Sequence, residues 1–406
     1  MVIEADMKAV IDRGETPADM EPMLLSEGSP HRPELSDLAV DLAGASAGLR
    51  RSLPEGVATA LAELVRAMNC YYSNLIEGHD THPVDIERAM RNEYSASPRT
   101  RNLQLEARAH VAVQRWIDAG GLAGRAVSRE SICDIHRRFG ALLPPELLTV
   151  RDPITGDDAA VVPGELRLRD VKVGDHVAIS PAAVPRFLER FEAVYGQLGR
   201  AETILAAAAA HHRLVWIHPF LDGNGRVARL LSHAVLLDAL GSGGLWSVAR
   251  GLARSEASYK AHLMSCDAPR RNDLDGRGAL SEDALAAFTR FFLETCLDQV
   301  RFMEQLVQPN RLRERILFWA QEAARLDELP SKAGQVLEAV LFRGELPRGD
   351  VPALLGTGER QARRVVAVLL ERGVLVSRTP RAPLRLSFPA ALAPRWMPGL
   401  FPEQPS

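Results

Sequence analysis

The feature that most constrains the fold of this chain is the segment His218–Arg229, which reads HPFLDGNGRVAR. Before it, residues 201–217 are rich in Ala and Leu and contain no Gly or Pro, a composition that predicts a buried helix. Pro219 disfavours the helical conformation at the residue before it, so this helix should end at His218. Apolar residues at helical spacing resume after Arg226 and stop at Gly241. The pattern therefore predicts two helices joined by a short loop.

The loop of this segment has the residues of an anion-binding site. Gly223 and Gly225 permit positive φ and let backbone N–H groups approach a ligand closely. Arg226 and Arg229 lie in the first turn of the second helix, whose N-terminus favours anions. Two neighbouring cations repel each other unless an anion joins them, and a polyphosphate would satisfy both guanidiniums and the loop N–H groups. We therefore expect a nucleotide phosphate at this loop.

Three further side chains of the segment complete the predicted site. Asp222 suits a hard divalent cation such as Mg²⁺, which takes one or two carboxylates together with phosphate oxygens. His218 can accept a proton at neutral pH, because the ordinary pKa of an imidazole is about 6.5. Phe220 is apolar and should anchor the loop in the core.

The segment resembles the Fic motif, whose pattern is His-x-Phe-x-Asp/Glu-Gly-Asn-Gly-Arg-x-x-Arg, at every specified position. The resemblance implies a mainly α fold, with a Fic-type helical core and a small β-hairpin flap. It also implies an enzyme, a protein adenylyltransferase that moves AMP from ATP to a hydroxyl side chain of a target protein. Kinases of the same superfamily replace the Gly-Asn-Gly part with a lysine-bearing variant. This chain lacks that variant, which favours nucleotidyl transfer over phosphoryl transfer.

The resemblance also implies a role for each residue of the motif. Tyr259, on a helix predicted over residues 255–265, is a candidate to line the adenine pocket, and a core or surface position is the alternative. In the roles that the resemblance implies, His218 is the general base and Asp222 binds Mg²⁺. The α- and β-phosphates bind at Gly223, Asn224 and Gly225. Arg226 contacts the phosphates, and Arg229 binds the γ-phosphate.

A second motif lies upstream at Ser73–Gly78, which reads SNLIEG. Apolar spacing predicts an amphipathic helix over residues 57–78, with the glycine as its C-terminal cap. Glu77 would then lie at the negative end of a helix, where a carboxylate needs a cationic partner. The pattern resembles the inhibitory helix of Fic proteins, in which the glutamate pairs with the second motif arginine, here Arg229, and Ser73 supports the contact. The alternative is a solvated glutamate at a helix end.

Residues 161–180 lack helical spacing and predict a β-hairpin. In Fic proteins a hairpin at this position is a flap that holds the target peptide by strand addition. An ordinary surface hairpin is the alternative. The pattern consists of Gly164, Gly174 and Asp175 with the stretches Leu166-Arg167-Leu168-Arg169, Val171-Lys172-Val173 and Val177-Ala178-Ile179.

The length of 406 residues suggests two or three domains. The net charge of −3 gives no general attraction to nucleic acids or membranes, and no apolar run reaches transmembrane length. The N-terminus lacks the pattern of a signal peptide, so we expect a cytoplasmic protein. The expected divisions are a flexible N-terminal segment (1–35), a helical region with the inhibitory helix (36–110), the Fic core (111–310), a linker helix (311–330), a winged helix-turn-helix (331–390) and a tail (391–406).

The winged helix-turn-helix is predicted from the order of its elements. Helical patterns over residues 332–342, 351–355 and 358–372 precede two short strands that would form the wing. Winged helices bind DNA in some proteins and serve as protein-binding or dimerising modules in others. DNA contacts would fall on the third helix, at Arg360, Arg363 and Arg364.

Two functional hypotheses follow from these patterns. The first is an autoinhibited adenylyltransferase that uses ATP and Mg²⁺, modifies itself and an unidentified target protein, and has the option of removing AMP as well. The second is a DNA-binding transcriptional regulator with a silent or nucleotide-sensing Fic core. The intact motif favours the first, because a silent core has no need to keep its histidine, aspartate and arginines. Truncation after about residue 330 should remove DNA binding but leave self-modification intact, because the motif and Glu77 both lie upstream.

Overall fold

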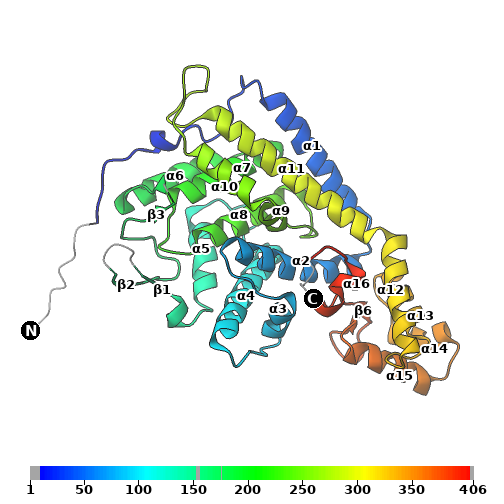
Figure 1. Ribbon diagram of the computed structural model, residues 1–406. Coiled ribbons are helices and arrows are strands. Elements are labelled where there is room, and N and C mark those ends of the chain that lie inside the picture. Colours follow the sequence, from blue (N-terminus) through cyan, green and yellow to red (C-terminus); the bar gives the residue numbers. More distant parts are fainter. Residues whose placement is uncertain (1–9, 152–155, 175, 403–406) are drawn as a thin grey trace, which may run out of the picture.

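The protein is mainly helical, as predicted, and its helices surround one central pair (Figure 1). The computed structural model describes residues 10–151, 156–174 and 176–402. The central pair consists of α7 (Arg200–Ile217) and α8 (Asn224–Leu240), which pack against each other and carry the motif loop between them. Every residue of α7 from Ile204 to Leu214 is buried, because its small alanines let other helices approach from all sides.

A long helix, α11 (Glu282–Val307), runs along α1 (Arg32–Arg51) and also covers α7 (Figure 1). Among the described residues, no helix is both long and apolar enough to cross a membrane. The other helices of this part of the chain are α2 (Glu55–Ile76), α3 (Pro83–Met90), α4 (Pro98–Trp116), α5 (Arg129–Gly140), α6 (Val184–Tyr195), α9 (Val248–Arg254) and α10 (Glu256–Cys266).

The helices predicted from apolar spacing are confirmed to within a few residues at each end. The helix predicted over residues 57–78 is α2, and Gly78 follows it with a φ of 81°, as a C-terminal cap requires. The helix before the motif ends at Ile217, and His218 leaves the helical conformation as Pro219 demands. Local spacing thus located these elements without reference to tertiary contacts.

The predicted hairpin over residues 161–180 is present but much shorter. β3 (Lys172–Val173) pairs antiparallel with β4 (His176–Val177), and Asp175 lies outside the described residues. The alternating stretch 166–169 is not a strand, so this part of the prediction was wrong. Its Arg167 is buried and its side chain is bonded to backbone carbonyls, which no surface strand would allow. A separate hairpin of β1 (Thr149–Arg151) and β2 (Asp158–Ala160), which was not predicted, precedes it.

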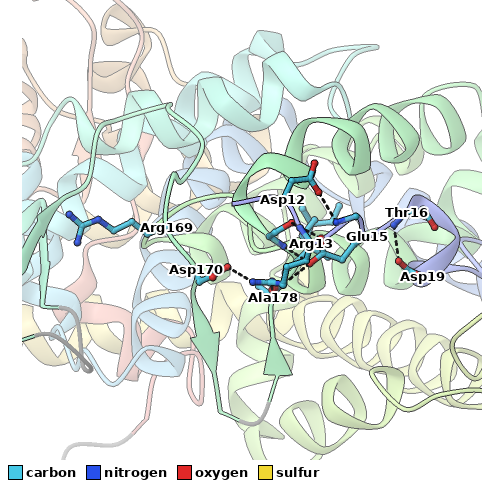
Figure 2. Close-up of polar contacts among 12 residues, drawn as sticks. Asp12, Arg13, Glu15, Thr16, Asp19, Arg169, Asp170 and Ala178 are labelled. Atoms are coloured by element: carbon cyan, nitrogen blue, oxygen red, sulfur yellow. Dashed lines mark hydrogen bonds and ion pairs between the residues drawn. The ribbon is translucent and has the colours of Figure 1, made fainter. Parts of the chain in front are cut away.

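Of the segment expected to be flexible (1–35), residues 10–35 pack against the rest of the protein, and residues 1–9 lie outside the described residues. Residues 10–16 are named here the N-terminal strap, and residues 161–180, which contain the β3–β4 hairpin, are named the flap. The strap lies against the flap, where Arg13 contacts Asp170, Ala178 and Ser180 (Figure 2). A short 3₁₀-helix, Pro17–Met20, follows, and α1 already begins at Arg32. The buried side chains of Met20 and Met23 explain the order, because apolar burial fixes a chain that its polar composition alone would leave free.

The C-terminal elements follow the predicted order of three helices and a two-stranded wing. They are joined to the core by α12 (Pro309–Arg325), which falls at the position of the predicted linker helix. The three helices and the wing are α13 (Ala333–Arg343), α14 (Val351–Leu355), α15 (Glu359–Glu371), β5 (Leu375–Val376) and β6 (Arg385–Leu386), with β5 and β6 antiparallel.

This C-terminal part packs against α2, the predicted inhibitory helix. The backbone of Gly344 approaches Gly56 so closely that a Cβ atom at Gly56 would lie 1.9 Å from the Gly344 oxygen. The predicted tail also folds back: it contains α16 (Ala393–Trp396), and residues 396–401, named here the C-terminal anchor, lie against α2. Residues after 330 therefore contact α2 directly, and the survival of self-modification after their deletion stays a prediction.

Candidate functional site

The motif loop is shaped by two residues in the left-handed region of backbone space. His218 has φ 51° and ψ 62°, and Gly223 has φ 81°. A histidine rarely adopts such a φ, whereas glycine does so freely. Between these two residues the chain turns from the end of α7 into the start of α8, so the backbone N–H groups of the first turn of α8 border the loop.

The interior of the loop is fixed by Phe220 and Asn224. Phe220 is fully buried, as predicted, and stacks on the ring of His136 with centroids 4.0 Å apart. The Asn224 side chain accepts a hydrogen bond from Phe220 N at 2.9 Å and donates one to Phe220 O at 2.8 Å. Both ends of this amide are therefore used within the loop. Asn224 thus shapes the loop, and the second hydrogen of its side-chain nitrogen is left for the phosphate contact that the resemblance implies, which stays a prediction.

The hydrogen bonding and the protonation state of His218 suit a group that accepts a proton. Its Nδ1 lies 3.3 Å from the carbonyl oxygen of Val215, and a hydrogen on Nδ1 leaves Nε2 free as a base. Burial lowers the pKa of His218 to about 4. The ring is consequently neutral at neutral pH, which is the state that a general base needs.

The predicted pairing of Glu77 with Arg229 is confirmed. Arg229 is almost fully buried and forms an ion pair with the Glu77 carboxylate. Its Nε donates to Ser73 Oγ at 2.9 Å, and its Nη2 donates to the Ser73 carbonyl at 3.1 Å. Burial raises the pKa of Glu77, but the Arg229 guanidinium outweighs it and the net pKa is below the ordinary value. Glu77 is thus ionised and engages the guanidinium expected to hold the γ-phosphate.

Gly225 does not adopt the backbone conformation that was predicted for it. It lies inside α8 and is absent from the described glycines with positive φ, so the expectation of positive φ was right for Gly223 and wrong here. A Cβ atom at Gly225 would lie 2.4 Å from Glu77 Oε1 and 3.2 Å from Arg229 Nη1. A side chain at this position would displace the Glu77 carboxylate, because the Glu77–Arg229 pair lies directly against the first turn of α8.

Arg226 and Asp222 form the outer part of the site. Arg226 Nη1 lies 3.3 Å from Glu106, and its guanidinium carbon lies 5.0 Å from the centroid of the Phe139 ring. The Asp222 carboxylate is 3.6 Å from Arg226 Nη2, and its side chain is 52% exposed. Asp222 is therefore accessible to a ligand, while Glu106 and Phe139 fix the position of the Arg226 guanidinium.

Tyr259 lies in the core beneath Arg229. It is 3% exposed, and its hydroxyl lies 2.7 Å from Nε2 of His211, whose Nδ1 contacts Ser232. Burial raises the pKa of Tyr259 to about 12. This placement agrees with the core alternative, and a contact with adenine stays a prediction.

The three arginines singled out in the C-terminal part lie together on α15. Arg360, Arg363 and Arg364 are all exposed, and Arg363 pairs with Glu359 one turn earlier. They lie far along the chain from the motif loop and belong to the separate C-terminal group of helices (Figure 1). Their exposure leaves them available to a partner of opposite charge.

Three residues around the loop were missed by the sequence interpretation. His136 supports Phe220, Glu106 pairs with Arg226, and Arg167 binds the carbonyl of His218. Each comes from an element distant in sequence from the motif. No local spacing marks them, and the alternation around Arg167 even suggested an exposed strand.

Comparisons with known proteins agree with this geometry. A family model described as Fic/DOC family matches residues 126–236, which include the flap and the motif loop but neither Glu77 nor the C-terminal helices. The chain is 28% identical to the protein adenylyltransferase Fic of Drosophila grimshawi over 197 residues, which are 48% of this chain and 36% of that protein. The protein of the same name in Drosophila ananassae is 34% identical over 127 residues, 31% of this chain and 22% of that protein.

The matched part of the chain thus spans at most 36% of the length of these relatives. Among solved structures, a Fic family protein from Desulfovibrio desulfuricans superposes with a TM-score of 0.51. The identity is 17%, and the superposition covers 90% of this chain and 98% of that one. A likeness at this level of identity supports the fold alone.

Proposed function

We propose that the protein is an adenylyltransferase that moves AMP from ATP to a Ser, Thr or Tyr hydroxyl of a target protein. The match of residues 126–236 to the Fic/DOC family model supports the proposal. The observation that carries the proposal is the arrangement of the loop His218–Arg229. A partly buried neutral imidazole, a half-exposed carboxylate and two arginines surround the first turn of α8. These are the groups that an attack on a nucleotide phosphate needs.

In the proposed reaction the target hydroxyl transfers its proton to Nε2 of His218 while its oxygen attacks the α-phosphorus of ATP. A new P–O bond forms to the target, the bond from the α-phosphorus to the bridging oxygen breaks, and pyrophosphate leaves. Arg226 and the backbone N–H groups at the start of α8 would stabilise the charge on the phosphates. The target backbone would lie along the short flap strands, where the side chains of Val173 and Val177 are exposed.

The residues present fit a Mg²⁺ ion that accompanies ATP. Asp222 offers one accessible carboxylate beside the phosphate-binding turn. In the described part of the chain no three His, Cys, Asp or Glu side chains are grouped to hold a metal by themselves. A cation at Asp222 would complete its coordination with phosphate oxygens and water, as Mg²⁺ commonly does, and would neutralise phosphate charge there.

We further propose that Glu77 inhibits this activity. Its carboxylate and Ser73 occupy the guanidinium of Arg229, which would otherwise take the γ-phosphate. ATP that cannot place its γ-phosphate there would bind with its α-phosphorus out of line for attack. The same carboxylate lies close to the motif loop, so removal of AMP through a water positioned by Glu77 is compatible with the arrangement.

The test is incubation with labelled ATP and Mg²⁺, with self-modification as the readout. Glu77→Gly should transfer on the order of tenfold more label than the wild type, which needs only about 1.4 kcal/mol of barrier change. His218→Ala in the same background should abolish transfer while ATP affinity stays within a few fold. Transfer at the Glu77→Gly level without His218 would contradict the assigned base.

The matched control is Glu55→Gly, which removes a glutamate from the opposite end of the same helix. The Glu55 side chain is 78% exposed and pairs only with Arg50 among the contacts of the described residues. It should leave transfer at the wild-type level. Equal activation by both variants would mean that any weakening of α2 suffices and that the Glu77–Arg229 pair has no specific role.

A second candidate function is DNA binding by the C-terminal part, favoured by the exposed arginines of α15. The C-terminal part would then be the regulatory module of an enzyme. In the alternative of a silent core, DNA binding would be the main function of the protein. Binding through Arg360 and Arg364 should weaken steeply with salt. A mobility shift that is lost in an Arg360→Ala/Arg364→Ala variant at low salt would support it. No shift at low salt would favour a protein partner or a homodimer instead.

A further inference from the structure

We propose that Arg167 is the positioning residue of His218: it holds the left-handed turn at the end of α7 in which the proposed base is presented. The reaction step rests on the proposed function, but the placement of His218 does not. Arg167 comes from the flap region, whereas His218 follows α7. Their contact therefore couples the element expected to hold the target to the group expected to deprotonate it.

Three hydrogen bonds from Arg167 reach the carbonyls around His218. Its Nε donates to the His218 carbonyl at 2.7 Å, and its Nη2 donates to the Ile217 carbonyl at 3.4 Å. Its backbone N–H donates to the Pro219 carbonyl at 3.0 Å. Three successive carbonyls are thus bound by one residue, which fixes the peptide planes on both sides of His218.

The turn needs such support because His218 is strained. Its φ of 51° lies in the left-handed region, where a residue with a Cβ atom is less stable by about 1–2 kcal/mol. Such a conformation persists only where the surroundings determine it. Without the guanidinium, the last carbonyls of α7 would be buried without their donor, and the turn could relax and swing the imidazole away from the loop.

Arg167 is a buried cation, and a side chain that only fills space at this position would not need a charge. The residue is 3% exposed, and no ion pair with a carboxylate is found for it among the described residues. Burial lowers the pKa of Arg167 to about 10, so the group remains protonated at neutral pH. The negative end of α7 stabilises the charge. A buried cation retained without a carboxylate is costly. Its guanidinium instead donates to backbone carbonyls, those of Ile217 and His218 at the turn and those of Arg169 and Ile179 in its own segment.

The N-terminal strap holds the same flap segment from its other side. Figure 2 shows Arg13 beside Asp170 and Ala178, with Nη1 donating to Asp170 at 2.8 Å and Nη2 to the Ala178 carbonyl at 2.9 Å. The carbonyl of the next residue, Ile179, accepts from Nη2 of Arg167 at 2.5 Å. The segment after β4 thus lies between two arginines. Arg13 fixes it from the surface, and Arg167 joins it to the His218 turn.

The experiment compares Arg167→Met with two controls, all in the active Glu77→Gly background. Arg213→Met removes another buried arginine, one on α7 itself whose guanidinium also binds a carbonyl, that of Pro22. Arg169→Met removes an exposed arginine of the same flap segment. The readouts are the single-turnover rate of AMP transfer, the Kd for ATP and the melting temperature.

Arg167→Met should lower the single-turnover rate on the order of 10²-fold, the loss expected when a reacting group is displaced by about 1 Å. Its Kd for ATP should stay within a few fold, because the phosphate-binding residues are not touched. Arg213→Met should lower the melting temperature comparably but keep the rate, and Arg169→Met should change neither. A rate that falls equally in Arg167→Met and Arg213→Met would overturn the positioning role.

A second measurement separates this proposal from the proposed function. In histidine-labelled protein, the ring resonances of His218 are assigned by their loss in His218→Ala. Arg167→Met should shift or broaden them, whereas Arg169→Met should leave them in place, whether or not the protein transfers AMP. Unchanged His218 resonances in Arg167→Met would overturn the positioning role. Changed resonances in a protein without transfer activity would support the positioning role and refute the proposed function.

Discussion

The N-terminal strap and the C-terminal anchor both tie an end of the described chain to the surroundings of the motif loop, but different forces hold them. The strap is held by charged and polar side chains, such as the Arg13–Asp170 pair, in which both side chains are about two-fifths exposed (41% and 42%). The anchor is held by burial, because Trp396, Met397 and Leu400 have at most 1% of their surface exposed.

The two ends also act on different parts of the proposed site. The strap contacts the flap segment that leads to Arg167 and His218. The anchor contacts α2 at Tyr72, a little more than one turn before Glu77. Exposed ion pairs contribute little and are screened by salt, whereas buried apolar contacts are strong and insensitive to it. We therefore expect salt to weaken the contact between the strap and the flap, beside the proposed base, and to leave the contact between the anchor and α2 unchanged.

Among the substitutions that test this comparison, Leu400→Ala should have the largest effect on stability. The side chain is fully buried, so its truncation should lower the free energy of unfolding by about 2–5 kcal/mol. Weaker support of α2 should also raise self-modification toward the Glu77→Gly level. Denaturant unfolding and label transfer measure both effects. Leu274→Ala, at a side chain that is 94% exposed, is the control, and equal losses in both variants would refute the anchor's role.

The pH dependence of transfer is the next largest effect. The pKa of His218 is lowered by burial to about 4, so the neutral form that accepts a proton persists well below neutral pH and is lost only as the pH falls toward that value. At a pH one unit below an ordinary pKa of about 6.5, an unperturbed histidine would be only about one-tenth neutral. The rate–pH profile of Glu77→Gly should therefore stay level to about pH 5. A loss of rate centred near the ordinary histidine pKa would show that His218 is not buried in the active state.

Tyr72→Phe should have a moderate effect on the anchor. The hydroxyl donates to the Leu400 carbonyl at 3.1 Å in a buried setting, and its removal leaves that carbonyl without this donor. We expect a loss of about 1 kcal/mol in the free energy of unfolding and a smaller rise in self-modification than with Leu400→Ala. A larger rise than that variant gives would mean that the hydroxyl, and not apolar burial, supports the inhibitory helix.

Arg13→Met should have the smallest effect on stability. The pair with Asp170 is exposed, so we expect a change below about 1 kcal/mol that disappears at high salt. Measuring unfolding of wild type and variant at low and high salt tests this directly. A loss that persists at high salt would contradict the contrast between the two ends, because the strap would then be held by more than charge.

The sequence by itself determined the elements that depend on neighbouring residues. Apolar spacing located α2, α7 and α8, and Pro219 marked where α7 ends. The motif Gly-Asn-Gly with its flanking histidine and arginines identified the loop, because all its parts lie within one short segment. Even Glu77 could be paired with Arg229, although the two are 152 residues apart, since resemblance supplied a contact that spacing alone does not encode.

Only the tertiary structure decided which side chains surround that loop and what holds the ends of the chain. Arg167 was predicted on an exposed strand and is instead buried at the His218 carbonyl. The two ends were predicted as a flexible segment and a simple tail, yet Met20 and Leu400 are fully buried. Local patterns report the period of a helix or strand, but they do not report which distant surface it meets. Whether an isolated charge or a polar chain end is buried depends on the tertiary contact that it makes, because the segment packed against it supplies the donors, acceptors and apolar area that stabilise it.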